Sequence, residues 1–541
     1  MKSARTCFTD ADAAIARLGM HKQRWAALDA ENRLRYLQDA IVGILQVADR
    51  WSIAACDAKG IDPTSSLAGE EWLAGVVTTL LNVRCLIKTL QGDRAIKAVR
   101  QQGDQLVAQV MPDDRINQVL WFGFKGEIWL KPGKPATRGT VRPPQVALVL
   151  GAGNIAATAP MDFLYKLFVE NQVVLLKMNP INDYLGAFFE QAFASLIRDG
   201  FLSIVYGDAQ LGGYLCQHSG IDTVHMTGSH HTHNAIVWGT SAPRTDPPIL
   251  KKPITSELGC VTPVIVVPGN WSNSDLARQA RHVASMVAHN ASFNCASAKV
   301  VITAKDWPQR SGFLDYLRQA FAAILPRQAY YPGAQNRYDQ FLDRYPNAEI
   351  FGNRTEAVIP WTLITDVAAV KGEYALSTEA FCGVLAQVSL DATSAPQFLQ
   401  QATEFVNDSV WGNLSCVMLI DPKTQRQHQR EFERAIAQLR YGAIGVNVWS
   451  GVIYGLPDLT WGAFPENSIY DIRSGLGMVH NAYGFDYPQK SVLYAPFRIR
   501  PTPIWFADHR NLLKLAQRLA MLQADPTWSN AAKSIIEALK G

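Results

Sequence analysis

Hydrophobic residues in the first part of the chain recur at every third or fourth position, with charged residues between them. Three stretches before about residue 115 show this pattern: DADAAIARLG, RWAALDAENRLRYLQDAIVGILQVADRW and EEWLAGVVTTLLNVRCLIKTLQ. Such spacing puts the apolar side chains on one face of an α-helix. The N-terminal part of the chain is therefore predicted to be helical, and it holds few residues that indicate a chemistry.

The pattern changes between residues 118 and 143, where aromatic and aliphatic residues alternate around Gly and Pro. Alternation with a period of two, interrupted by turn residues, indicates a β-hairpin or an exposed β-ribbon. An exposed ribbon of this kind often pairs with another chain.

Continuous apolar strands then alternate with amphipathic helices. A first series contains QVALVLG, VVLLK and LSIVYG, and a second, with TPVIVV and AKVVIT, begins after Glu257. Strands that are apolar on both faces and alternate with helices indicate a parallel sheet covered on both sides. Two α/β domains are therefore predicted. From about residue 490 an extended segment, SVLYAPFRI, precedes an amphipathic helix, HRNLLKLAQRLAMLQ, which we expect to dock on another domain or subunit rather than on a membrane surface.

Length and composition set further limits. The 541 residues predict about three or four packed units, because a typical domain has ~150 residues. With 51 Lys and Arg against 47 Asp and Glu, the charge gives no reason to expect a nucleic-acid partner. The eight cysteines are scattered, the N-terminus lacks the features of a secretory signal, and no apolar run is long enough to span a membrane. We therefore expect a cytoplasmic protein with reduced thiols and no integral membrane segment.

A glycine turn follows the first apolar strand. Residues 151–156, GAGNIA, fit the G-x-G-x-x-G/A fingerprint, in which backbone N–H groups approach a pyrophosphate at a helix N-terminus. The acidic residue expected about 20 positions later is absent, and the second strand ends at Lys177, which fits ribose hydroxyls or a phosphate. A tight strand-to-helix turn without a ligand stays open as the alternative.

Two further turns carry a carboxylate and a thiol. Glu257 stands in an otherwise uncharged stretch before an apolar strand, where burial would raise its pKa toward the range of a general base. Cys295 stands in a loop of small and amide residues at 290–297, which lets a substrate reach the sulfur. A thiolate attacks carbonyl carbon, and a nearby carboxylate can then activate water to release a thioester. A buried thiol and a structural carboxylate are the alternatives.

At these residues the sequence resembles the NAD(P)-dependent aldehyde dehydrogenase superfamily, over about residues 118 to 500. SELG at 256–259 resembles the family's glutamate motif, which makes Glu257 the match for its general base. The loop at 290–297 resembles the one around the family's catalytic cysteine, which makes Cys295 the nucleophile. Asn154 matches the asparagine whose side-chain amide, with the cysteine's backbone N–H, forms the oxyanion hole.

The resemblance also implies a cofactor and the residues that bind it. MTGS at 226–229 and EAFCGV at 379–384 look like two of the family's cofactor segments, and NDSVWGNL at 407–414 and GVN at 445–447 resemble later ones. NAD is the expected cofactor, with NADP as the alternative because Pro180 stands where many NAD-specific members have a glutamate. The implied contacts are Lys177, Gly207, Gly228, Ser229, Glu379 and Phe381.

The fold class implied by the resemblance is α/β, aldehyde dehydrogenase-like, with two Rossmann-like α/β domains and a β-ribbon oligomerisation arm. Residues 1–117 and 144–255 form the expected cofactor-binding domain and 256–470 the catalytic domain. Residues 118–143 with 490–503 form the expected arm, which would join a homodimer or homotetramer, and 504–541 form a C-terminal helical extension.

The expected reaction is oxidation of an aldehyde to a carboxylic acid through a thiohemiacetal and a thioester on Cys295. Phe163, Trp449 and Phe464 are candidate substrate contacts, and aromatic walls favour an apolar or aromatic aldehyde. An acylating enzyme that transfers the acyl group to coenzyme A, and a catalytically silent relative, are the alternatives. Because adjacent histidines on one turn, such as His230 and His231, cannot all face one ion, we expect no metal site.

Overall fold

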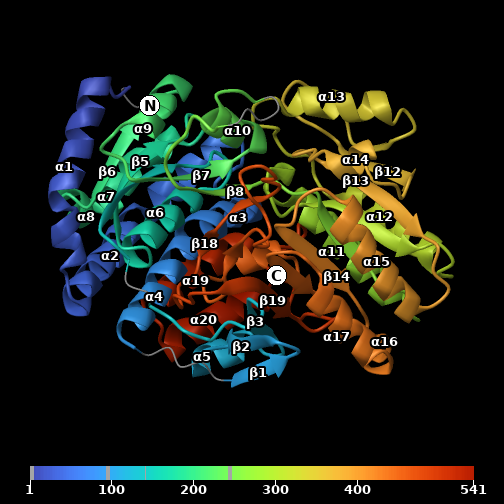
Figure 1. Ribbon diagram of the computed structural model, residues 1–541. Helices are drawn as coiled ribbons and strands as arrows, with labels where there is room; N and C mark the ends of the chain where they lie inside the picture. Colours follow the sequence, from blue (N-terminus) through green and yellow to red (C-terminus); the bar gives the residue numbers. More distant parts are fainter. Residues whose placement is uncertain (1–4, 93–97, 140–141, 242–246) are drawn as a thin grey trace.

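The computed structural model describes residues 5–92, 98–139, 142–241 and 247–541. Two large sheets, one of six strands and one of eleven, lie side by side, as Figure 1 shows, and a two-stranded sheet, β16 (Trp461–Gly462) with β18 (Met478–His480), completes the β structure. The predicted α/β class is confirmed, and each large sheet has its own hydrophobic core.

The N-terminal part is helical as predicted as far as Leu90, but the prediction of helices up to about residue 115 is wrong for 98–111, where two strands lie. Helix α1 (Phe8–Ala26) and α2 (Ala30–Ala58) precede a continuous helical stretch made of η1 (Ser66–Ala68), α3 (Gly69–Trp72), η2 (Leu73–Val77) and α4 (Thr78–Leu90). The stretch Ser66–Leu90 is long and apolar enough to cross a membrane, but 61% of its apolar window is buried inside the molecule. It packs against α2 on one side and against a C-terminal helix on the other, as a core helix does.

The six-stranded sheet has the order β17-β8-β7-β4-β5-β6, and all its neighbouring strands are parallel except β17. Its chain order reverses at β4, with β5 and β6 on one side and β7 and β8 on the other, so a crevice opens at the carboxyl ends of β4 and β7. The strands are β4 (Gln145–Leu150), β5 (Gln172–Met178), β6 (Leu202–Tyr206), β7 (Thr223–Gly228), β8 (Ile254–Leu258) and β17 (Gly475–Leu476). The helices are α6 (Thr158–Phe168), η3 (Asp183–Leu185), α7 (Gly186–Ala192), α8 (Ala194–Arg198), α9 (Ala209–Gln217) and α10 (His230–Trp238).

The eleven-stranded sheet has the order β1-β2-β3-β19-β15-β14-β9-β10-β13-β12-β11. Its strands beyond β8 are β9 (Thr262–Val266), β10 (Ala298–Ala304), β11 (Glu349–Phe351), β12 (Trp361–Val367), β13 (Val384–Leu390), β14 (Ser415–Leu419), β15 (Ala443–Val446) and β19 (Pro488–Tyr494). The helices are α11 (Asn273–Ala288), η4 (His289–Ser292), α12 (Arg310–Ala323), α13 (Ala334–Arg344), α14 (Tyr374–Ser377), α15 (Ala395–Ser409), α16 (Pro422–Gln427), α17 (Gln429–Gln438) and α18 (Gly451–Tyr454).

No hairpin forms within 118–143, but the segment belongs to an antiparallel β-ribbon, the other predicted form, and it pairs with the later part of the expected arm. Helix α5 (Arg115–Leu120) is followed by one strand, β3 (Lys125–Leu130), whose partners are β2 (Gln105–Met111) and β19. The alternating residues of β3 are buried because β19 joins the strand to the catalytic sheet of the same chain. Strands β1 (Ala98–Gln102) and β2 were not predicted, and residues 140 and 141 of the expected arm lie outside the described part of the chain. Its role between subunits stays a prediction.

Two boundaries can now be placed. Strand β8, which carries Glu257, belongs to the six-stranded sheet, so the chain changes sheets after Leu258 and not at residue 256. The C-terminal extension contains two helices, α19 (Leu512–Ala524) and α20 (Trp528–Ala538), of which only the first was predicted. As Figure 1 shows, both lie beside the arm strands, and α19 packs on the stretch Ser66–Leu90. The expected docking against another domain is therefore confirmed.

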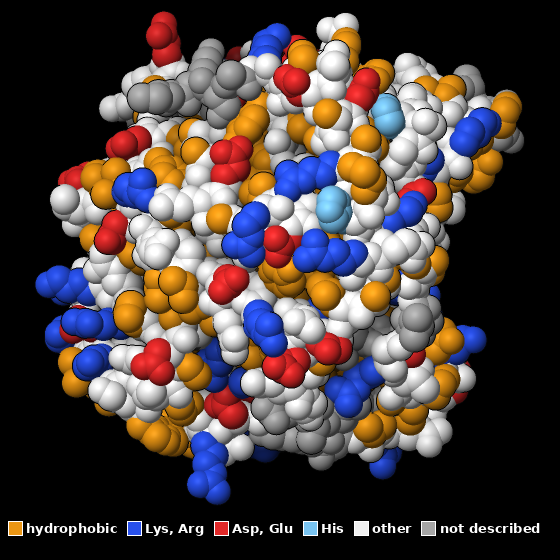
Figure 2. All heavy atoms as spheres, turned by 90° about the vertical axis from the view of Figure 1, so that its left-hand side faces the viewer, with side chains coloured by type: hydrophobic (Ala, Val, Ile, Leu, Met, Phe, Trp, Pro, Cys, Tyr) orange, Lys and Arg blue, Asp and Glu red, His pale blue; other side chains and the backbone are white. Residues whose placement is uncertain are grey.

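The face that carries the N-terminal helices has a mixed surface. Figure 2 shows Lys and Arg interspersed with Asp and Glu there, with single apolar side chains between them. The exposed apolar residues of α1 and α2, Met20, Val42 and Ile53, are separated along the chain. This face presents no one-signed charge field of the kind that attracts a polyanion.

Candidate active site

The thiol and the carboxylate singled out in the sequence meet directly. Cys295 lies in the loop between η4 and β10, and its Sγ donates a hydrogen bond to Oε1 of Glu257 over 2.9 Å. The indole N–H of Trp461 donates to the same oxygen over 3.2 Å. Glu257 is held from both sides, because β8 pairs with β7 and with β17, where a side chain at Gly475 would collide with the carbonyl oxygen of Ser256.

Burial sets the proton affinities of this pair. Removal from water raises the pKa of Glu257 to about 7, and the hydrogen bonds from Cys295 and Trp461 offset only part of that rise. Burial first, and then the Glu257 charge, raises the pKa of the Cys295 thiol well above its usual value. The thiol therefore does not ionise alone near neutral pH, and the carboxylate beside it is the group that can take its proton.

Asn154 lies beside the cysteine loop, at the glycine turn between β4 and α6. Its amide nitrogen donates to the carbonyl oxygen of Phe293 over 2.9 Å. An amide nitrogen carries two hydrogens, so the second remains for an oxygen atom in the cavity that Asn154, Cys295 and Glu257 line together. The structure thus brings the three predicted catalytic residues to one cavity.

The backbone before Cys295 is strained. Asn290, Ala291 and Ser292 have φ of 52°, 53° and 71°, a run of left-handed conformations in residues other than glycine. Each such residue costs about 1–3 kcal/mol and persists only where its surroundings enforce it. Lys299 provides part of that support, because its buried ammonium donates to the carbonyl and hydroxyl oxygens of Ser292 over 3.2 and 2.7 Å.

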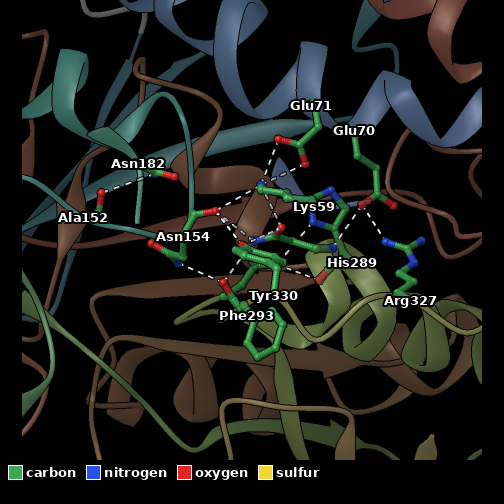
Figure 3. Close-up of polar contacts among 12 residues, drawn as sticks. Lys59, Glu70, Glu71, Ala152, Asn154, Asn182, His289, Phe293, Arg327 and Tyr330 are labelled. Atoms are coloured by element: carbon green, nitrogen blue, oxygen red, sulfur yellow. Dashed lines mark hydrogen bonds and ion pairs between the residues drawn. The ribbon is translucent and has the colours of Figure 1, made fainter. Parts of the chain in front are cut away.

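A buried polar network provides the rest of the support, and sequence reasoning missed it. Figure 3 shows Lys59, from the end of α2, among the turn of Asn154, the cysteine loop and α3. Its ammonium donates to Oδ1 of Asn290 over 3.0 Å and to the carbonyl oxygen of Asn154 over 3.2 Å, and it pairs with Glu71 at 2.8 Å. The hydroxyl of Tyr330 donates to the same two oxygens, over 3.0 Å each.

A second ion pair completes this network. Glu70 accepts from Arg327 over 2.6 Å and from the backbone N–H of Asn290 over 3.0 Å, and both contacts are drawn in the region of Figure 3. Despite full burial, the charge of Arg327 brings the pKa of Glu70 down to about 2. The sequence held no signal for Lys59 and Glu70, because they lie more than 200 positions from Asn290 in the chain.

The predicted cofactor contacts gather at one edge of the six-stranded sheet. Leu150, which precedes the glycine turn, is in register with Lys177 of β5 and with Met226 of β7. Gly207 follows β6, while Gly228 ends β7 and Ser229 caps α10. Both of the latter are exposed at the switch point, where a dinucleotide binds in doubly wound sheets.

Two observations show that this edge fits a dinucleotide. Within the described residues the Lys177 ammonium makes no hydrogen bond, and its burial lowers its pKa. A Cβ at Gly153 would come within 2.8 Å of Oδ1 of Asn179, so a side chain there would displace Asn179, whereas glycine leaves the backbone of the turn open to a phosphate. An amine placed in this way suits ribose hydroxyls.

Glu379 and Phe381 lie on the other side of the cysteine loop. The carboxylate of Glu379 accepts from the backbone N–H of Cys260 over 3.3 Å, and a Cβ at Gly259 would lie 1.9 Å from its Oε2. Removal from water raises the pKa of Glu379 to about 7. The ring centroid of Phe381 lies 5.7 Å from that of Phe293, so this predicted cofactor residue packs against the loop that carries the thiol, whereas Glu379 contacts Cys260.

Of the three candidate substrate contacts, one lies at the site. Trp449 lines the cavity, and its indole N–H donates to the carbonyl oxygen of Ala296 over 2.7 Å. Phe163 does not, because it faces the core of the six-stranded sheet, where its ring packs edge-on against Phe193 at 4.8 Å. Phe464 also lies outside the lining. Tyr454 and the helical residues Leu73 and Val77 line the cavity instead.

The histidines of α10 do not form a metal cluster. The ring centroids of His230 and His231 lie 4.0 Å apart, whereas the side chain of His233 is fully buried. Within residues 5–92, 98–139, 142–241 and 247–541 no group of three or more His, Cys, Asp or Glu side chains is placed to hold an ion.

Comparisons with known proteins show which family and which solved structures this chain resembles. Residues 146–327 match the model of the aldehyde dehydrogenase family. Lactaldehyde dehydrogenase from Escherichia coli has a TM-score of 0.62 at 18% identity, covering 90% of this chain and 91% of that one. Glyceraldehyde-3-phosphate dehydrogenase from Methanocaldococcus jannaschii, in complex with NADP, has 0.62 at 12%, with coverages of 91% and 96%.

A third similar structure is an aldehyde dehydrogenase from Pseudomonas syringae in complex with NAD+ and octanal, with a TM-score of 0.61 at 15% identity and coverages of 92% and 91%. Comparison with curated protein sequences gave no match. The chain therefore has the fold of the aldehyde dehydrogenases, and its residues 146–327 match the model of that family.

Proposed function

We propose that this protein oxidises an apolar aldehyde to the carboxylic acid with a nicotinamide dinucleotide as the electron acceptor. The observation that carries the proposal is the 2.9 Å hydrogen bond between Cys295 and Glu257 in a cavity that Asn154 also lines. A thiol, a neighbouring base whose pKa lies near neutral pH and an amide donor are the three groups that a thioester route requires.

The first step is activation of the thiol. Glu257, whose pKa lies at about 7, accepts the proton from Cys295 as the sulfur attacks the carbonyl carbon of the aldehyde. A C–S bond forms and the carbonyl oxygen gains the negative charge. The free amide hydrogen of Asn154, with the backbone N–H of Cys295, stabilises that oxygen.

The second half-reaction releases the acid. A dinucleotide held by Lys177, Ser229 and Glu379 supplies, when bound, the acceptor for the hydride of the thiohemiacetal. Collapse of the oxyanion leaves a thioester on Cys295. After Glu257 has released the proton of Cys295 to solvent, its carboxylate takes a proton from water, whose oxygen attacks the acyl carbon and expels the thiolate. Because the carboxylate of Glu257 lies beside the sulfur, we favour hydrolysis of the thioester over transfer of the acyl group to coenzyme A.

The proposal also covers the cofactor, the assembly and the location of the protein. NAD is our first choice and NADP the alternative, in line with the two similar structures that hold NAD+ and NADP. We infer a homodimer or homotetramer that works in the cytoplasm, with no nucleic-acid partner. Apolar and aromatic residues dominate the cavity wall, which supports an apolar aldehyde as substrate.

The experiment that tests the function is an aldehyde panel, read by cofactor absorbance with NAD and with NADP. We expect Cys295→Ala to abolish turnover. Cys216→Ala, which removes a buried thiol outside the site, is the matched control and should keep it. Aldehyde-dependent reduction that persists in Cys295→Ala would refute the assignment, and formation of acyl-CoA on addition of coenzyme A would identify an acylating enzyme.

A further inference from the structure

The cavity that holds Cys295 extends well beyond the catalytic residues. It has a volume of about 710 Å³, in the range of small-molecule sites. Its inner part is formed by the catalytic residues together with Trp449, Tyr454 and Trp461. Its outer part is formed by residues that the proposed chemistry does not use, from α4, from the segment 119–124 and from the C-terminal extension.

The two C-terminal helices contribute one wall of this outer part. Helix α19 lines it with Leu515, Leu519 and Gln523, and α20 with Ser534, Ile535 and Ala538. Helix α19 is fixed against the stretch Ser66–Leu90, which also forms the wall beside Asn154, and α20 is fixed against α5. The wall therefore runs continuously from the sulfur to the C-terminal helices.

Most side chains of the outer part are apolar, while Asn117, Gln523, Ser534 and two arginines, Arg498 and the exposed Arg500, also line the cavity. Leu73, Val77 and Leu81 line it from the helical stretch, and Leu120, Trp121 and Phe124 line it from the arm. At the rim, Val119 and Phe122 leave 49% and 85% of their surface exposed to water. The guanidinium of Arg498 is bound by Asp275 over 2.6 and 2.7 Å, so its charge is already paired.

We propose that α19 and α20 build the outer half of an aldehyde channel, and that the substrate is a long unbranched aliphatic aldehyde. This inference rests on the proposed function, which it narrows. The aldehyde group sits at Cys295, and the hydrocarbon chain extends along α4 to the wall formed by Leu519, Ile535 and Ala538. A small or charged aldehyde would leave this apolar wall in contact with water, whereas a long chain covers it.

The dependence of kcat/KM on the length of the aldehyde tests whether the hydrocarbon chain occupies the outer part of the cavity. Each methylene transferred from water to an apolar wall improves binding by about fourfold. For the unmodified enzyme we expect kcat/KM to rise by about 100-fold or more from propanal to dodecanal, because the added methylenes reach the outer wall.

Two matched pairs of variants on α20 test the wall itself. Ala538→Trp and Ile535→Trp place an indole in the channel, while Ala532→Trp and Ile536→Trp place it on the exposed side of the same helix. We expect Ala538→Trp and Ile535→Trp to lower kcat/KM for hexadecanal by about tenfold or more, because the contacts of a few methylene groups are lost. The kcat/KM for propanal should change by no more than about twofold. The second two should leave both substrates unchanged.

Two results would overturn the inference while leaving the proposed function intact: a kcat/KM that does not rise from propanal to hexadecanal, or equal effects of the inward and outward variants. Failure to oxidise any aldehyde would instead remove the proposed function. In that case titration calorimetry with hexadecanoate still tests the channel. Binding that is lost in Ala538→Trp and kept in Ala532→Trp supports it, and absence of binding by the unmodified protein refutes it.

Discussion

The ammonium group of Lys59 lies 3.2 Å from the carbonyl oxygen of Asn154 and donates a hydrogen bond to it. A residue of an N-terminal helix thereby fixes the backbone of the residue that we assign to the oxyanion hole. The same ammonium binds the side chain of Asn290, which in turn donates to the carbonyl of Phe293 beside Cys295. Lys59 is therefore a positioning residue, which acts through two loops without touching the reacting atoms.

Replacement of Lys59 by Met should lower kcat by about 10- to 100-fold with little change in KM, because small displacements of catalytic groups have effects of this size. It should also lower the free energy of unfolding by about 3–5 kcal/mol, because the charge of Glu71 stays buried without its partner. Steady-state kinetics and urea unfolding measure the two effects.

The double variant Lys59→Met with Glu71→Gln separates the two roles. With both charges removed, most of the lost stability should return. The kcat should stay low, because the oxygens of Asn154 and Asn290 still lack the ammonium group of Lys59 and keep only the hydroxyl of Tyr330. If kcat recovers together with stability, Lys59 has a structural role only.

Asn154→Ala should lower kcat by about 10²–10³-fold with a small change in KM, because a donor to a developing oxyanion acts mainly in the transition state. Asn182→Ala is the matched control. Its amide supports the carbonyl of Ala152 in the same turn, over 3.4 Å, but does not line the cavity. Similar losses in the two variants would mean that Asn154 only shapes the turn.

The rate should depend on the ionisation of Glu257. Since burial raises the pKa of Glu257 to about 7, the carboxyl is protonated and unable to accept the thiol proton at lower pH. We expect kcat/KM to rise through about pH 7 and then level off, and the step to be absent from the residual activity of Glu257→Gln. A pH profile of both proteins measures this, and an unchanged step in the variant would assign it to another group.

The same shift predicts a change in stability. The native carboxyl binds its proton more tightly than the unfolded one, so the protein loses stability as pH rises from about 4.5 to about 7. At pH 8 Glu257→Gln should therefore be more stable than the parent by up to about 3 kcal/mol, and near pH 4 the gain should vanish. Urea unfolding at the two pH values tests the sign.

Gly259→Ala should weaken cofactor binding. Its methyl group would lie 1.9 Å from Oε2 of Glu379, so the carboxylate that we assign to the nicotinamide ribose must move. We expect KM for the dinucleotide to rise by about tenfold, because one hydrogen bond to a charged group is lost. Gly312→Ala, in α12, where the new methyl would lie 4.0 Å from Leu276, should change neither KM nor kcat.

Local sequence patterns predicted the strands and the reactive residues close to their ends. The parallel sheets and the glycine turn could be predicted, because apolar runs and turn residues are local signals. Glu257 and Cys295 stood out because each is a reactive group in a stretch of small, uncharged residues. Their hydrogen bond is a finding of the structure.

The remaining features depend on contacts that no local pattern encodes. Phe163 was misassigned because spacing along α6 cannot tell a core face from a cavity face when the helix is buried all round. The Lys59 network joins residues that are far apart in the chain, and its charges are buried, where hydropathy predicts none. The segment 118–143 has the composition of a ribbon, but its strand pairs with one that comes more than 350 residues later.

That late pairing has a consequence for how the protein is made. Strand β19 lies between β3 and β15 in the eleven-stranded sheet, yet nearly all of the chain is synthesised before it. Until then the nascent chain exposes two strand edges, each a template for wrong pairing with other chains. The eleven-stranded sheet thus becomes continuous only after β19 has been synthesised, which favours slow formation of this sheet.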